Sequence, residues 1–336
     1  MPGPHDLFAR FTFSHPERAA AELRAVLPPE VVSRVDWTSL RREPVSVVDP
    51  ELRESQSDLL FSAQLQDGQP LLLYLLLEHQ SSVDRWMALR MLRYVVRHLE
   101  HWRKEHPASE VLPVVVPLVM YHGGEAGWTA PRRVEALFQL PSDEGELERW
   151  RALVPRFEYL LDDLTAEREE TLRARPGPPL ARLAFLLLRH GRDEGLSWRL
   201  EGWKALVAEI HAEAEGLEEL RAVVHYLFEV GPPAARKTLR RVLQSVAGKE
   251  REEDLMKSYA DELREEGHQQ GWLKGLAEGQ AQGRALAVLQ VLAARGVEVD
   301  EKSRHLILSC TDSAILDRWL VQASSASHLS DLQLNN

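Results

Sequence analysis

The chain has 336 residues, of which 44% are hydrophobic and 28% charged, and its formal net charge is −11 at pH 7. This length suits two or three packed units, and the composition is that of globular domains rather than of disordered or fibrous chains. A single cysteine excludes a disulfide framework and a cysteine-rich zinc site, and the negative charge argues against a protein that coats nucleic acid over its whole surface.

The first residues, MPGPHDLFARF, contain no basic stretch followed by an apolar one, so no signal peptide is expected. The longest apolar run, residues 71–77, is too short to cross a bilayer. We therefore expect a cytoplasmic protein without a membrane partner.

The first predicted element is a helix. Apolar residues recur at helical spacing over residues 5–27, and Pro28-Pro29 would end the helix because proline lacks a donor N–H and restricts the residue before it. Asp6, near the start, carries a charge that the helix dipole favours.

A β-hairpin is predicted next. Strands are expected at 45–49 and 58–65, and the two-residue turn signal Asp67-Gly68 leads to a strand at 70–80. Because PLLLYLLLEHQ is almost continuously apolar, this last strand should be covered on both faces and lie centrally in a mixed sheet.

The following elements are expected in the order helix, strand, strand, at residues 84–105, 111–124 and 157–161. Asp162-Asp163 is then expected to be a pair of surface turn acids, although Asp163 ends a strand, so a role for it in a functional site stays open. Helices and strands in this order predict an α/β layer fold.

The C-terminal half is predicted to be helical. The segment ARPGPPL at 174–180 marks a boundary, and the periodic segments after it have helical spacing. The parts expected are an α/β domain, a helical region, a glycine-repeat helix or spacer, and a helical tail, over residues 1–175, 176–252, 253–285 and 286–336.

A glycine occurs at every fourth residue from 267 to 283, in a segment rich in Glu, Gln, Lys and Ala. Glycine is unfavourable inside a helix, so this regular repeat suggests close helix–helix packing, through which the chain would form a homo-oligomer. The alternative is a flexible polar spacer.

Three polar residues on the predicted hairpin point to metal chemistry: Asp58, Glu78 and Gln80. Glu78 and Gln80 share one face of their strand, and the turn brings the strand of Asp58 against it. Carboxylate and amide oxygens are hard ligands that suit Mg²⁺ or Mn²⁺. The pattern is loose, however, and Glu78 is alternatively the residue at which a buried strand reaches solvent.

The N-terminal half resembles the recombination-promoting nuclease and putative transposase family (YhgA-like), a branch of the PD-(D/E)XK nucleases. The resemblance covers residues 5–165 and rests on separate motifs in compatible order: HDLFARFTF, LPPEVVSRVDWTSL, VDPELRESQSDLLF, LLLYLLLEHQSSVDRWMALRMLRYV, VVVPLVMYHGG and FEYLLDDL.

The resemblance implies an α/β fold: a restriction-endonuclease-like mixed-sheet core, here followed by an all-helical C-terminal region. By similarity, Asp58 and Glu78 are catalytic acids that hold Mg²⁺, or Mn²⁺ or Ca²⁺ in its place, and Gln80 occupies the position of the usual lysine. The resemblance also makes Asp6 a lesser candidate, because the first helix of such folds can lend an acid to the metal site. A neutral amide cannot supply the charge of lysine, so the metal or another cation must supply it.

The helix at 84–105 offers that cation. Arg90, Tyr94 and Arg97 share one helix face, and in the resembling family an Arg and a Tyr follow the E-x-Q at this spacing. We expect Arg90 to reach the scissile phosphate or to hold Glu78. The alternative is a solvated basic face above a Tyr94 that packs in the core.

The same helix is the most basic element expected in the domain. Arg85, Arg93, Arg97 and Lys104 are predicted to contact DNA phosphates. No helix-turn-helix or zinc-finger signature accompanies them, so backbone contacts should dominate and sequence preference should be weak.

The residues and the resemblance together predict a DNA endonuclease that hydrolyses phosphodiester bonds with a metal ion and is linked to recombination or mobile elements. Three alternatives stay open: a catalytically inactive DNA-binding or recombination accessory protein, a toxin or defence nuclease controlled by a partner, and an oligomeric scaffold whose nuclease domain is vestigial.

Overall fold

The computed structural model describes residues 3–43, 58–78, 83–123, 127–310, 312–332 and 334, without the side chains of 58, 74–78, 144–145, 260 and 262–278. The strand expected at 45–49 lies outside the described residues. The chain forms two compact units, Met1–Lys257 and Ser258–Asn336.

Two helices, rather than one, open the first unit. α1 spans Pro4–Phe13 and α2 spans Pro16–Val26, so the single helix predicted over 5–27 is wrong. The break lies at His15, whose ψ of 127° is extended. The ring of Pro16 is the physical reason, because proline disfavours a helical conformation in the residue before it.

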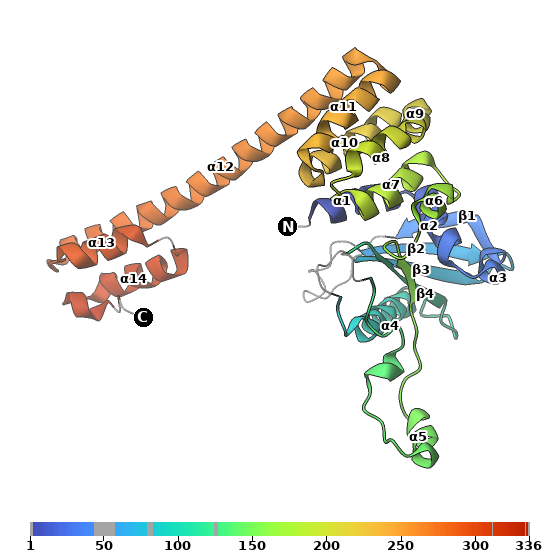
Figure 1. The fold of residues 1–336 in the computed structure, drawn as a ribbon. Coiled ribbons are helices and arrows are strands. Elements are labelled where there is room, and N and C mark those ends of the chain that lie inside the picture. The colour runs from blue at the N-terminus through green and yellow to red at the C-terminus, as the bar shows by residue number, and fades with distance from the viewer. Residues whose placement is uncertain are drawn as a thin grey trace. The chain divides into compact units, whose positions relative to one another are not determined.

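A five-stranded mixed sheet in the order β1-β2-β3-β4-β5 follows (Figure 1). Its strands are β1 (Val35–Glu43), β2 (Asp58–Leu65), β3 (Pro70–Glu78), β4 (Val114–Tyr121) and β5 (Leu160–Asp163). β1, β2 and β3 pair antiparallel, whereas β3, β4 and β5 pair parallel. The predicted α/β class, with the second hairpin strand in the middle of a mixed sheet, is confirmed.

The turn between β2 and β3 differs from the two-residue turn predicted. The N–H of Gly68 donates to the carbonyl of Leu65, and the N–H of Leu65 donates to the carbonyl of Gln69, both at 2.8 Å, so the loop has three residues. Within this loop only Gly68 has a positive φ, of 85°. Asp67 instead places its carboxylate 2.9 Å from Nη2 of Arg34.

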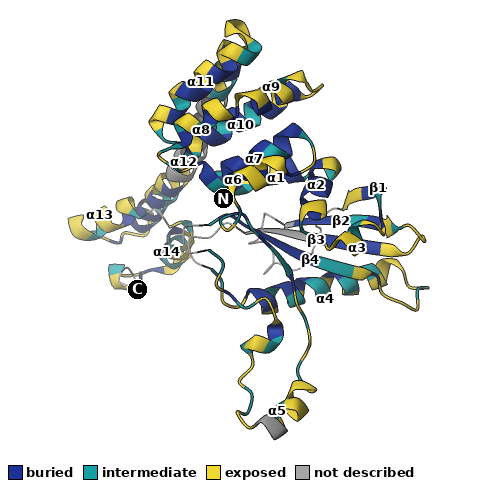
Figure 2. Ribbon diagram, turned by 45° about the vertical axis from the view of Figure 1, so that its right-hand side comes forward, coloured by how far each residue is buried: buried dark blue, intermediate teal, exposed yellow. Residues whose placement is uncertain are grey.

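Helices cover both faces of the sheet. α4 (Met87–Glu105) lies against one face, where Met91 packs with Leu60, Leu72 and Val119. α1 and α2 lie against the other face, and Figure 2 shows their inner sides as buried. Coverage on both sides explains why β3 is apolar without alternation.

The other elements of the first unit are α3 (Pro29–Val32), η2 (Val134–Leu137), α5 (Glu144–Arg151), α6 (Glu169–Ala174), α7 (Pro179–His190), α8 (Leu196–Gly202), α9 (Lys204–Ala212), α10 (Gly216–Val230) and α11 (Pro233–Ala247). The helices from α7 onward confirm the predicted helical C-terminal region.

The glycine repeat lies inside one long helix, α12 (Lys249–Ala294). It is followed by α13 (Glu301–Ser309), α14 (Ser313–Ser325) and η3 (Leu329–Asp331). The second unit has its own core, in which Val288, Leu292 and Trp319 are buried together. The four-part division of the chain stays a prediction.

In the described part of the chain, no helix combines the length and the apolar character that a membrane span requires.

Candidate active site

The hairpin register brings the positions of Asp58 and Glu78 together, at the end of the hairpin away from its turn. Asp58 begins β2 and is the Cα partner of Leu76, and Glu78 ends β3 two residues further on. Such diagonal neighbours in an antiparallel pair lie roughly 7–8 Å apart and share a face of the sheet. Gln80, the third residue of the predicted trio, lies outside the described residues.

The face in question is the one that α4 covers. Leu60 and Leu72 have the same strand parity as the two acids, and both pack in the core under α4. Two carboxylates at these positions fit a hard divalent cation. No cluster of three or more His, Cys, Asp or Glu that could hold a metal occurs among the side chains that are described, which do not include Asp58 and Glu78.

The position of Glu78 aligns with one residue on each of the two neighbouring parallel strands. Tyr121 of β4 is the Cα partner of Glu78, and Asp163 of β5 is the Cα partner of Tyr121. The Asp163 carboxylate accepts the N–H of Trp128 at 2.9 Å, and the N–H and hydroxyl of Thr165 at 3.0 and 2.6 Å. These bonds fix the segment after β4 against the end of β5.

An aromatic cluster forms at this end of the sheet. The rings of Tyr121 and Trp128 meet edge to face at 5.0 Å, and Nε1 of Trp128 donates to the hydroxyl of Tyr159 at 3.0 Å. Burial raises the pKa of Tyr159 to about 12, so this phenol stays neutral near pH 7. Gly123 leaves room for the side chain of Tyr121, because a Cβ added to Gly123 would lie 2.3 Å from Oη of Tyr121.

Arg90 lies in the first turn of α4, paired with Asp84. Its Nη1 is 3.3 Å from Oδ2 of Asp84, and both side chains are largely buried. Oδ1 of Asp84 accepts the N–H of Trp86 at 2.8 Å, so one carboxylate fixes the start of α4 and the guanidinium. The charge of Asp84 raises the pKa of Tyr159 and that of Arg90 lowers it, both as smaller causes than burial. Contact of Arg90 with Glu78 or with phosphate stays a prediction.

The outer side of α4 is basic. Arg85, Arg93, Arg97 and Lys104, the predicted DNA-contacting residues, are all exposed. Tyr94 belongs instead to the core beneath the helix, with the Arg93 guanidinium 5.8 Å from its ring centroid.

Asp6, the lesser metal candidate, bonds within its own helix. Its Oδ2 accepts the N–H of Gly3 at 3.2 Å. The neighbouring His5 is buried, with Nδ1 2.9 Å from Oη of Tyr226 in α10 and its ring 5.3 Å from that of His122. These contacts tie α1 to the helical region and to the end of β4.

Asp162 is not the surface turn acid that the sequence suggested. It lies in β5, 5% exposed, and Arg175 bonds both of its carboxylate oxygens, at 2.6 and 2.7 Å. Arg175 also lies 3.1 Å from Oε2 of Glu22 in α2. Burial, and then the charge of Asp162, raises the pKa of Glu22 well above its usual value. This buried triad ties α2 to β5 and to the end of α6, on the sheet face opposite the acids.

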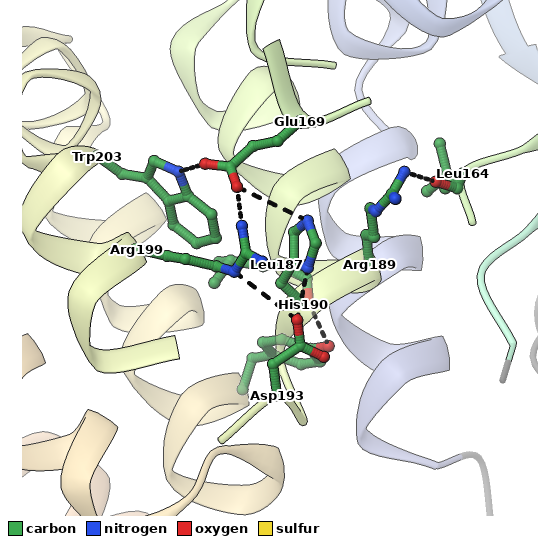
Figure 3. A network of polar contacts seen from close by, with 9 residues as sticks. Leu164, Glu169, Leu187, Arg189, His190, Asp193, Arg199 and Trp203 are labelled. Atoms are coloured by element: carbon green, nitrogen blue, oxygen red, sulfur yellow. Dashed lines mark hydrogen bonds and ion pairs between the residues drawn. The ribbon is translucent and has the colours of Figure 1, made fainter. Parts of the chain in front are cut away.

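A second polar cluster joins α6, α7, α8 and α9 (Figure 3). Glu169 accepts from Arg199 and, at 2.8 Å, from Nε1 of Trp203. Nδ1 of His190 lies 2.6 Å from Asp193, and burial lowers the pKa of His190. These carboxylates already have cationic or N–H partners, so we interpret the cluster as a tie between helices.

Three residues around the site, Asp84, Trp128 and Tyr159, were not predicted. Asp84 had a signal, because an aspartate just before a helical pattern is a typical capping residue. Tyr159 lies in the predicted strand at 157–161, but nothing in the sequence pairs it with Trp128, which comes 31 residues earlier on a segment without a hydrophobic period.

Residues 3–218 match the model of a protein family described as "Putative transposase, YhgA-like". No solved structure matches the chain.

Curated relatives also match. The chain is 30% identical, over 80% of its length and 84% of the relative's, to "Inactive recombination-promoting nuclease-like protein RpnE" of Escherichia coli (strain K12). It is 27% identical to "Recombination-promoting nuclease RpnA" of the same strain, over 91% of its length and 94% of the relative's. A shorter match, 36% identical over 37% of this chain and 46% of the relative, is to "Recombination-promoting nuclease RpnD" of Escherichia coli O157:H7.

Proposed function

The chain belongs to the YhgA-like putative transposase family, and from that membership we propose that it is a nuclease linked to DNA recombination. Two of the relatives described above are named recombination-promoting nucleases. The structural observation that supports the proposal most is the hairpin register, which sets Asp58 diagonal to Glu78 at one end of β2 and β3.

In more detail, the proposal is a metal-dependent endonuclease that hydrolyses phosphodiester bonds in DNA. A Mg²⁺, Mn²⁺ or Ca²⁺ ion held by Asp58 and Glu78 would supply Lewis-acid stabilisation of charge on the phosphate. Gln80 would orient the attacking water through its amide, without the charge of a lysine. Arg90, on α4, would supply the positive charge that a lysine at position 80 would provide.

The basic side of α4 would hold the DNA. Arg85, Arg93, Arg97 and Lys104 are suited to phosphates, which carry no direct sequence information. Low sequence preference and strong weakening of binding by salt follow from such contacts. The cytoplasm is the location that fits a DNA substrate.

Incubation of supercoiled plasmid with the full chain tests the enzyme proposal. Nicking should require Mg²⁺, Mn²⁺ or Ca²⁺, stop with EDTA, and be absent from a variant with both Asp58→Ala and Glu78→Ala. Equal nicking by wild type and this double variant would reject the proposal.

A second candidate is a catalytically inactive DNA-binding accessory protein. It is favoured by one comparison, because the relative that is 30% identical over 80% of the chain is named inactive. This candidate predicts that the wild type binds DNA without nicking it under any of the three metals. A toxin or defence nuclease controlled by a partner would instead nick once the partner is removed.

Replacing Arg90 with alanine should lower nicking by about a hundredfold, because the loss of one donor to developing charge typically has that effect. Arg90→Lys should retain part of the rate, since it keeps the charge without the planar fork. Rates of both variants, measured against wild type at saturating DNA, check this. Unchanged turnover in both would remove Arg90 from the mechanism.

We also propose self-association through the glycine repeat of α12. Among the described residues nothing lies within 4 Å of a Cβ added at Gly279 or Gly283, so the described part of the chain has space for a larger side chain there. Gly279→Leu with Gly283→Leu should therefore lower the mass of the full chain in light scattering. Gln282→Leu, at an exposed position between them, is the control. An unchanged mass in the double variant would support the spacer alternative.

A further inference from the structure

The start of α4 exposes a large apolar surface among its arginines. Trp86, which immediately precedes the helix, is 55% exposed, and Leu89 is 49% exposed. Spacings of three and four residues place Trp86, Leu89, Arg93 and Arg97 on one stripe of the helix. The apolar side chains of Trp86 and Leu89 therefore lie next to basic residues on the same surface.

The backbone of Trp86 is fixed at the start of the helix by two hydrogen bonds. Its backbone N–H donates to Oδ1 of Asp84 at 2.8 Å, and its carbonyl accepts the N–H of Arg90 at 3.0 Å. Asp84 also pairs with the Arg90 guanidinium. Trp86 thus lies one helical turn from Arg90, and the Asp84 carboxylate contacts both residues.

Phosphate binding does not explain an exposed indole. A phosphate is bound by charge and by hydrogen-bond donors, both of which the arginines supply. An indole adds a flat apolar face, which stacks on nucleic-acid bases. In an intact duplex the base faces are covered by their neighbours, so such a face serves a substrate that has unpaired bases.

We propose that Trp86 stacks on an unpaired base while the arginines of α4 bind the adjoining phosphates. The preferred substrate class is then DNA with a single-stranded segment, such as gapped or branched DNA, rather than continuous duplex. The combination of a basic track with an aromatic platform is typical of proteins that bind single strands. The inference rests on the proposed nuclease function and adds its substrate class.

Binding of the full chain to fluorescein-labelled DNA tests this, with EDTA present so that no cleavage occurs. Three probes are compared by anisotropy: a continuous duplex, the same duplex with a central gap in one strand, and the gapped form with abasic units opposite the gap. Wild type should bind the gapped probe more tightly than either of the other two. The abasic probe separates base stacking from the flexibility of an unpaired backbone.

Trp86→Ala should weaken binding of the gapped probe by roughly ten- to a hundredfold, as expected for the loss of one base–aromatic stack. Its affinity for the duplex should change by less than about twofold, because the phosphate contacts remain. Trp86→Phe should keep most of the gap preference. Trp198→Ala is the matched control, because Trp198 in α8 is 63% exposed and also adjoins an arginine.

The outcomes distinguish this inference from the proposed function. Equal binding of duplex and gapped probes by wild type, or equal affinities of wild type and Trp86→Ala for every probe, overturns the role of Trp86 and leaves the nuclease proposal intact. The second of these results would instead suit a protein-binding surface. Absence of any DNA binding by wild type overturns both.

Discussion

Changing Asp58 to asparagine, or Glu78 to glutamine, should lower the rate of plasmid nicking by about a thousandfold. Each change keeps the shape of the side chain but replaces a charged ligand by a neutral amide. Weaker metal binding then forfeits several kcal/mol of stabilisation in the transition state, which corresponds to about three powers of ten in rate. DNA binding should be retained, because less negative charge would face the phosphates.

Two controls make this result specific. Asp67→Asn alters an acid at the turn end of the same hairpin, where it pairs with an exposed arginine, and should leave nicking unchanged. A higher Mn²⁺ concentration should recover part of the activity of Asp58→Asn if the loss is one of metal affinity. Loss of activity in Asp67→Asn to the same degree would point to a folding defect instead.

Arg175→Met should lower the free energy of unfolding by about 3–5 kcal/mol. The guanidinium is the cation of a triad in which Glu22 is fully buried and Asp162 is 5% exposed. Removing it leaves the buried Asp162 carboxylate, and Glu22 whenever it is ionised, without a counter-charge. Urea denaturation followed by circular dichroism measures the change, and a loss below about 1 kcal/mol would contradict this view of the triad.

The same triad predicts how stability responds to pH. The folded-state pKa of Glu22 is raised above its usual 4.5, so its stabilising contribution is complete below that pH and is lost as the pH rises through the folded value. Glu22→Gln imitates the protonated acid, so it should gain stability relative to wild type as the pH rises from 4.5 through the folded-state pKa of Glu22. Equal pH profiles for the two proteins would exclude Glu22 as the responsible group.

The hairpin was the most predictable part of the fold. Its strands at 58–65 and 70–78 follow from a long apolar run on one side of an Asp-Gly turn, and α4 follows from its amphipathic stripe. Pairing of these strands also brings Asp58 near Glu78, because strand register fixes which positions are neighbours. The sequence pattern of a segment was sufficient to predict its structure wherever that structure did not depend on contacts with distant segments.

The features that escaped prediction depend on contacts between distant segments. β1 breaks its own alternation, since its register with β2 shifts between Asp36 and Arg41. Asp162 resembled a turn acid because its partners, Glu22 and Arg175, come from other elements. The pairing of Trp128 with Tyr159 depends likewise on packing after the sheet has formed.

The contact between α1 and α10 bears on how the protein is made. Phe8 stacks on Tyr226 at 4.4 Å, and His5 is hydrogen-bonded to the same side chain, 221 residues later in the chain. At roughly 5–20 residues per second, the ribosome needs about 10–40 s to make that intervening stretch. Until then the side of α1 that α10 covers, with Phe8 on it, lacks this packing partner. A fragment that ends near residue 175 would lack this partner permanently, so aggregation is its expected fate.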